Sequence, residues 1–386
     1  MNNLVKIPLA YQAIMDDIGW FTGADDRHRG MPSRSGMTRN HVAEDYKVVN
    51  EVGKRINQKI CCALVIGEWD KNNRLTGRPH MTPNPEAWDC ASVINMPEAE
   101  RCFEAIEESD YIDIAHHGIL HSFWDDELGH DDRQYYIRAR KSYTRPGPRY
   151  AVPVEVDYFK KCLEAYDEIY NDWGFTKPVD TFISPGFVSL SAEDNKEIIH
   201  AISEHGFKYW TNSWAGTDFD CEIVDAVTFL KKRKETIPWN AYDVNPDALP
   251  PYSEEEGTIF RCHWPNMLRY DPMQNLEKVD AWANFFHRRS EVFGIIISES
   301  IQFAAHQAQY NRFTDMTFTE NEIILDFSKV DTCGAKDIGN TVYISMRNNI
   351  RPKACTGGHL SLYQTKQIFR TYKLEREGNI AKIRIK

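Results

Sequence analysis

The sequence predicts an α/β protein with a parallel sheet, open or closed into a barrel, followed by a small antiparallel β domain. Continuous apolar runs, which are typical of strands covered on both faces, alternate with amphipathic helical patterns over most of the chain. From about Phe318 the pattern changes to short strands of alternating polarity between turn residues. We therefore expect an α/β domain over 1–315 and a β-sandwich-like domain over 318–386.

The expected strands of the α/β domain are short apolar runs that end in polar or glycine-rich sequence. They span 10–17, 59–67, 111–115, 179–183, 207–211, 258–262 and 293–297. Helices are expected between them over 41–57, 97–109, 157–173, 192–205, 275–291 and 301–310. In the helix over 157–173, Phe159, Leu163 and Tyr166 form one apolar stripe, and Gly174 favours its termination.

Long loops follow several of these strands, at 18–40, 68–96, 122–156 and 212–257. Because the carboxyl ends of parallel strands lie at one edge of a sheet, we expect the loops to surround a pocket there. The basic run at 231–234 lies in this region, and we expect it to be a solvated face.

The C-terminal part shows five short strands, over 322–327, 341–345, 359–363, 369–374 and 379–385. Turn residues such as Gly357-Gly358 separate them, as in an antiparallel sandwich. A core formed by about 70 residues alone is modest, so we expect this domain to pack on the α/β domain through an apolar interface.

Charge and composition argue against several classes of partner. The 386 residues carry a formal net charge of −11, which disfavours nucleic acid or an anionic membrane surface. No apolar run approaches the roughly 18 residues of a membrane span, and the first residues lack the apolar segment of a secretion signal. The nine cysteines have no paired spacing, which is typical of free thiols, so we expect a cytoplasmic protein.

Two polar clusters stand at the ends of apolar runs and could form one site. Asp16 and Asp17 end the first strand, and His117 and His121 follow the strand that ends near Ala115. Two imidazoles and one carboxylate make a three-donor site with positions left open for water and substrate. A second carboxylate can take a proton from water, so the set is typical of metal-assisted hydrolysis.

These residues, by type and order, resemble the NodB-homology polysaccharide deacetylases, the family 4 carbohydrate esterases and their relatives, over roughly residues 10–310. The resemblance implies a distorted (β/α)7 barrel and removal of an acetyl group from an N-acetylated sugar. Carried over, Asp16 is the general base, and Asp17, His117 and His121 bind a divalent metal, for which we expect zinc.

The family also has an arginine that steadies the base, in a turn that follows a strand. Here that turn reads Phe182-Ile-Ser-Pro185-Gly186 and contains no arginine. Arg145 or Arg261 could take its place.

A late histidine is expected to donate the proton to the leaving group. His263, at the end of a strand, is preferred to His306, which lies in a helical pattern. The tryptophan wall of the family could be supplied by Trp210 or Trp214. The residues expected to bind substrate are Trp20, Trp69, Trp214, Trp264, Pro185 and Gly186.

The sequence therefore predicts a metal-dependent carbohydrate deacetylase that acts on an amide C–N bond. Two other functions stay open. The barrel could be a catalytically impaired sugar-binding module, as the missing arginine suggests, or it could hydrolyse another C–N bond on the same scaffold.

Overall fold

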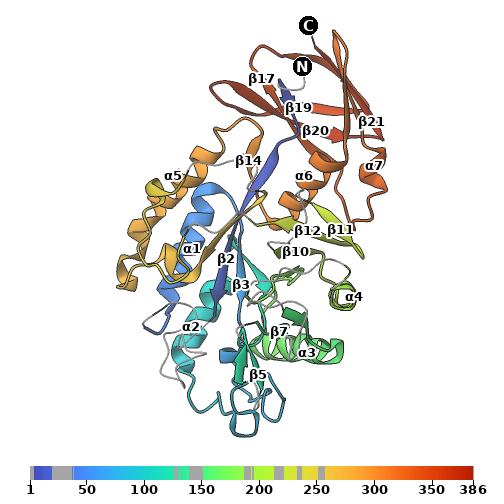
Figure 1. Cartoon of the computed structure of the whole chain (residues 1–386). Coiled ribbons are helices and arrows are strands. Elements are labelled where there is room, and N and C mark those ends of the chain that lie inside the picture. The colour runs from blue at the N-terminus through green and yellow to red at the C-terminus, as the bar shows by residue number, and fades with distance from the viewer. Residues whose placement is uncertain are drawn as a thin grey trace.

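The computed structural model describes residues 4–19, 37, 39–125, 129–131, 133–138, 151–186, 193, 195–212, 221–232, 237–250 and 257–385. Figure 1 shows a helix-covered sheet and, at one end of it, a β domain beside which both ends of the chain lie. The α/β class is therefore confirmed, and an antiparallel unit follows it.

The main sheet has nine strands among the described residues. Its path runs β11-β12-β10-β9-β4-β3-β2-β13, and β14 also pairs with β2. Every pairing in it is parallel except that of β11 with β12. The bounds are β2 (Leu9–Ile18), β3 (Ile60–Leu64), β4 (Ile112–His116), β9 (Thr181–Phe182), β10 (Tyr209–Asn212), β11 (Glu222–Val224), β12 (Val227–Lys231), β13 (Ile259–His263) and β14 (Ile295–Ile297).

A closed barrel is not found in the part of the chain that the structure describes. The two sides of the sheet nevertheless approach each other, because an isolated parallel bridge joins Lys232, just after β12, to Ile259 at the start of β13. One bridge is less than a strand ladder, so the structure establishes a parallel α/β sheet and not a barrel.

Helices cover one face of this sheet, as the apolar stripes predict. They are α1 (Ala43–Ile56), α2 (Met96–Glu107), α3 (Val156–Trp173), α4 (Lys196–His205) and α5 (Val279–Arg289), and α6 (Ile301–Phe313) packs on the other face. The helix expected to begin at residue 275 begins at Val279, after a 3₁₀ segment over Pro272–Lys278. Gly174 ends α3 with φ of +77°, a conformation that glycine adopts without strain.

Strand residues divide between two apolar clusters according to the two-residue repeat. Met15 and Cys62 belong to the large cluster under the helices, whereas Ile14 and Cys61 belong to a smaller one with Leu230 and α6. We call the side that carries the smaller cluster the inner face. Because side chains alternate along a strand, residues two positions after Ile14 or Leu230 also point toward the inner face.

The expected long loop over 122–156 contains two short hairpins. β5 (Phe123–Asp125) pairs with β6 (Gly129–Asp131), and β7 (Tyr136–Arg138) pairs with β8 (Ala151–Pro153). The loop after β3 holds short 3₁₀ turns at Gly67–Trp69 and Pro85–Ala87. Among the described helices, none is long and apolar enough to cross a membrane.

The β domain consists of two four-stranded antiparallel sheets with orders β1-β17-β20-β19 and β15-β16-β21-β18. The bounds are β1 (Val5–Lys6), β15 (Asp315–Phe318), β16 (Glu322–Asp326), β17 (Thr341–Arg347), β18 (Pro352–Thr356), β19 (Gly358–Thr365), β20 (Phe369–Arg376) and β21 (Ile380–Ile385), with a short α7 (Ser328–Asp331). Strand β1 comes from the N-terminus, which the sequence did not lead us to expect. Val5 and Ile7 share the core of this domain with Tyr310 of α6, so the two units have a common apolar contact.

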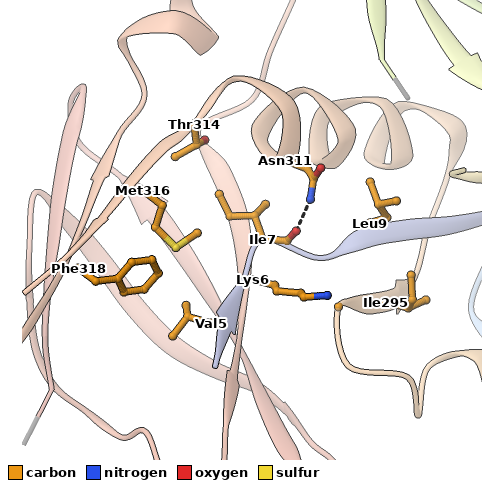
Figure 2. A pocket seen from close by; sticks show the side chains of 10 residues that line it. Val5, Lys6, Ile7, Leu9, Ile295, Asn311, Thr314, Met316 and Phe318 are labelled. Atoms are coloured by element: carbon orange, nitrogen blue, oxygen red, sulfur yellow. Dashed lines mark hydrogen bonds between the residues drawn. The ribbon is translucent and has the colours of Figure 1, made fainter. Parts of the chain in front are cut away.

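A cavity of about 430 Å³ lies where the two units meet (Figure 2). Its wall includes Leu9 and Ile295, at the first residues of β2 and β14, and Asn311, whose side chain donates to the carbonyl of Ile7. Leu9 and Asp16 are seven residues apart on one strand, about 23 Å at the usual rise. The cavity is therefore at the opposite end of the sheet from the predicted site.

Candidate metal centre

Asp16 and Asp17 stand at a bulge near the end of β2. The pairing of β2 with β3 shifts register between Met15 and Ile18, and Asp17 has φ of +65°. In a regular strand these two neighbours would point to opposite faces, whereas a bulge can re-aim one of them. Both carboxylates are buried, and both interact electrostatically with His117 and His263.

His117 and His121 lie in a tight loop after β4, and this loop is not helical. Gly118 and His121 have φ of +81° and +60°, so the backbone turns twice through the left-handed region. Main-chain bonds fix the loop to the end of β3, and the side-chain oxygen of Gln134 accepts from the amide of Ile119 at 2.7 Å. Left-handed backbone at a non-glycine residue is costly and is enriched at functional sites.

Three donor atoms converge at this point. Oδ1 of Asp17 lies 3.1 Å from Nε2 of His117 and 3.3 Å from Nε2 of His121. Tetrahedral ligands about 2.1 Å from a zinc ion lie about 3.4 Å from one another. The spacing therefore suits a divalent ion, and these residues form the one group of three or more metal-ligating side chains found in the described chain.

The hydrogen bonds around the two rings also suit a cation. Nδ1 of His117 lies 2.8 Å from the carbonyl oxygen of Ile183, which can only accept, so Nδ1 carries a proton and Nε2, which faces Oδ1 of Asp17, is the nitrogen left to bind an ion. The amide of Gly186 donates to Nε2 of His121 at 3.2 Å, so that nitrogen carries no proton, and an ion bound there would replace this hydrogen bond. Burial alone would raise the pKa of Asp17, but His121 and His117 outweigh it and hold that pKa below its usual range.

Asp16 is held by two cations. Nζ of Lys232 donates to Oδ2 of Asp16 at 3.3 Å, and Nε of Arg261 forms an ion pair with the same oxygen at 2.6 Å. Burial raises the pKa of Asp16, but Lys232 and Arg261 outweigh it, so the pKa lies below its usual range. Of the two arginines considered for this contact, Arg261 makes it, and Arg145 lies outside the described residues.

Lys232 was missed, and the expectation that the basic run is solvated is wrong for this residue. Only 6% of Lys232 is exposed, and burial lowers its pKa to about 8. The strand period gives only the direction of this side chain, because Lys232 stands two positions after the apolar Leu230 of the inner face, and the pairing with Ile259 is needed to show that the position is buried.

His263 belongs to the site, whereas His306 does not. Nε2 of His263 lies 3.9 Å from Oδ2 of Asp17 and accepts a hydrogen bond from Nη2 of Arg261 at 3.0 Å. His306 is on α6 and lies against Gly339 of the β domain.

His116, which directly precedes His117 and is a third histidine near the two expected donors, is a core residue. Its ring centroid lies 4.2 Å from that of Tyr166 and 5.4 Å from that of Phe182. Burial lowers its pKa well below the usual range, so it stays neutral. The ligand pair is therefore His117 and His121.

The expected substrate-binding residues divide into three groups. Trp69 and Trp264 are fully buried in the helix-side core, so neither ring faces solvent and the expectation that they stack on a substrate is not met. Trp20 and Trp214 lie outside the described residues, and Trp210, considered for the tryptophan wall, is buried against Phe182. Pro185 lies against Gly118, so the turn at 185–186 packs against the loop that carries His117 and His121.

A second cavity, of about 370 Å³, lies on the side of the sheet where the strands end. Its wall includes His41, Trp88 and Ile94. The ring of His41 meets Trp264 edge-on, and Trp264 directly follows His263. His41 of the cavity wall therefore contacts Trp264, and none of the described residues of the metal site lines this cavity.

Comparison with protein-family models and with curated proteins finds no match. Two solved structures are distantly similar. One, from Mycobacterium smegmatis, has a provisional assignment as a polysaccharide deacetylase; it is 12% identical with a TM-score of 0.42, over 81% of this chain and 97% of that one. The other, an endogalactoceramidase, is 10% identical with a TM-score of 0.25, over 98% of this chain and 96% of that one.

Likeness at this level carries no argument about function. The described fold and site define an α/β protein with a buried Asp-His-His group, able to hold a metal, where the parallel strands end.

Proposed function

We propose that this protein is a metal-dependent hydrolase that removes an acetyl or other acyl group from an N-acetylated sugar or glycan. One observation carries the proposal: a buried three-donor group, Asp17, His117 and His121, has a second buried carboxylate beside it, that of Asp16. The choice of an amide on a sugar rests on the motif resemblance. A zinc ion held by the three donors would polarise a carbonyl oxygen and lower the pKa of water.

The residues of the chain then have distinct tasks. Oδ1 of Asp16 is buried and has no hydrogen-bond partner among the described residues, so it is the atom suited to take the proton of the attacking water. The water oxygen bonds to the carbonyl carbon and the C–N bond breaks, so the products are a carboxylate and an amine. The leaving nitrogen needs one proton, and we assign this role to His263, whose Nε2 lies 3.9 Å from Oδ2 of Asp17.

The hydrogen bond from Arg261 sets a condition on that last step. It directs the lone pair of Nε2 of His263 toward the guanidinium, so the proton of the neutral ring is on Nδ1. His263 can donate from Nε2 only after this contact is broken and the ring has taken up a proton at Nε2. We therefore propose that substrate binding displaces Nη2 of Arg261 from His263.

The catalytically impaired alternative depended on the absence of the family's arginine. The contact of Arg261 with Asp16 weakens that reason. We also propose that the strands close into the seven-stranded barrel that the resemblance implies, and the bridge between Lys232 and Ile259 supports this closure.

The test is an acetate-release screen over N-acetylated sugars, nucleotide sugars and oligosaccharides, with zinc, cobalt or nickel added. We expect one class to be hydrolysed, and we expect activity to be lost on chelation and in His117→Ala. Release of ammonia or of another acid from a different amide would move the function to another C–N hydrolase. Sugar binding without turnover would favour the binding-module alternative.

A further inference from the structure

We propose that Lys232 is a positioning residue: with Arg261 it holds Asp16 by one carboxylate oxygen and so leaves the other for the reacting water. The inference rests on the proposed function, in which Asp16 is the base. The contact of Lys232 with Asp16, and the stability that it contributes, do not depend on that function.

Both cations meet the same atom. Oδ2 of Asp16 is 3.3 Å from Nζ of Lys232 and 2.6 Å from Nε of Arg261, and Oδ1 takes no hydrogen bond from any described residue. Rotation of the carboxylate out of its present plane would break both contacts in a buried site, where charge contacts are costly to lose. The orientation of Oδ1 therefore depends on the two cations together.

The fold brings these residues together through the two-residue period of the strands. Ile14, Leu230 and Ile259 lie in the inner cluster, and Asp16, Lys232 and Arg261 each follow one of them by two positions. The bridge between Lys232 and Ile259 fixes the backbone of the lysine against β13. Lys232 thus reaches Asp16 from the residue after β12, whereas Arg261 reaches it from β13, the strand paired with β2.

A buried lysine beside a carboxylate could also serve stability alone. The two roles differ in kinetics, because misplacement of a base lowers kcat whereas loss of stability without misplacement leaves kcat per folded molecule unchanged. We therefore compare Lys232→Met and Lys232→Ala with Lys231→Met. Lys231 is the preceding residue, its side chain points away from the inner face by strand alternation, and it is the matched control.

We expect kcat of both Lys232 variants to fall about 10²-fold while KM changes less than about twofold. Metal content should equal that of the wild type, and Lys231→Met should keep its kcat. In Lys232→Ala, n-propylammonium should restore kcat about tenfold because it can donate to Oδ2, whereas tetramethylammonium, which has no N–H, should not. Unchanged kcat in Lys232→Met, or equal effects of the two amines, would overturn the positioning role.

A second measurement needs no activity. Lys232→Met should lower the Tm by about 3–6 °C in the wild-type background and by much less in an Asp16→Asn background. Equal shifts in the two backgrounds would overturn the contact itself. The wild type could hydrolyse no screened substrate while the Tm effect of Lys232→Met still depends on Asp16. In that case the proposed function fails, but the contact of Lys232 with Asp16 is supported.

Discussion

Zinc should stabilise the wild-type protein, and loss of either histidine donor should abolish that stabilisation. A ligand that binds only the folded state at 100 times its Kd contributes about 2.7 kcal/mol. Unfolding entropy of about 2.1 cal/mol/K per residue gives about 0.8 kcal/mol/K for the 386 residues. The expected rise in Tm is therefore about 3 °C, a shift that scanning calorimetry resolves.

The comparison uses chelated protein titrated with zinc, as wild type and as His117→Ala and His121→Ala. His359→Ala is the control, because this exposed histidine lies on β19 in the β domain. We expect the control to keep the full shift and the two donor variants to lose it. A wild-type Tm that does not respond to zinc, or an equal rise in His117→Ala, would refute the proposed metal centre, and elemental analysis of the protein as isolated checks the same point.

Four further outcomes follow from the site and the fold. Asp16→Asn should retain the metal, measured by elemental analysis, but lose about 10²–10⁴-fold in kcat, and normal turnover would move the base elsewhere. The carboxyl of Asp17 has a lowered pKa in the folded protein, so its ionised form adds stability above about pH 4, and this stability is lost as the pH falls toward the folded pKa. In metal-free protein, the Tm of Asp17→Asn should therefore fall less than that of wild type between about pH 5 and pH 3. Parallel curves of Tm against pH for the two proteins would contradict this. Gly118→Ala should cost about 2–4 kcal/mol in urea unfolding and weaken zinc binding, because φ is +81° and the new Cβ would lie 2.8 Å from Cγ of Pro185. Truncation at Thr317 should give poorly soluble protein, since it removes the partners of β1 and uncovers Tyr310; a soluble truncation would contradict the shared core.

The sequence predicted the metal donors because strand ends can be recognised from apolar continuity. Asp17 and His117 each follow such a run, and parallel strands place their carboxyl ends at one edge. The tryptophans show the limit of the same reasoning. Trp264 also follows a strand end, yet it turns into the core beneath α1, and position along the chain cannot distinguish the two directions.

Two features required information that is not local in the sequence. Lys232 lies in a run of charges that suggests a solvated face, and its burial becomes expected only when β12 is aligned in register with its neighbours. Strand β1 has only two residues, and its partner β17 begins at Thr341, so no local pattern could connect them. The burial of Lys232 and the existence of β1 therefore both depend on pairing between segments that are far apart in the sequence.

The position of β2 also has a consequence for synthesis on the ribosome. This strand is made well before its neighbours β13 and β14, which begin only at Ile259 and Ile295, and the partner of β1 comes later still. Until then one edge of an apolar strand has no partner within the sheet. Exposed strand edges of this kind aggregate and are bound by chaperones, so the nascent chain is prone to aggregation until β13 and β14 have been made and cover this edge of β2.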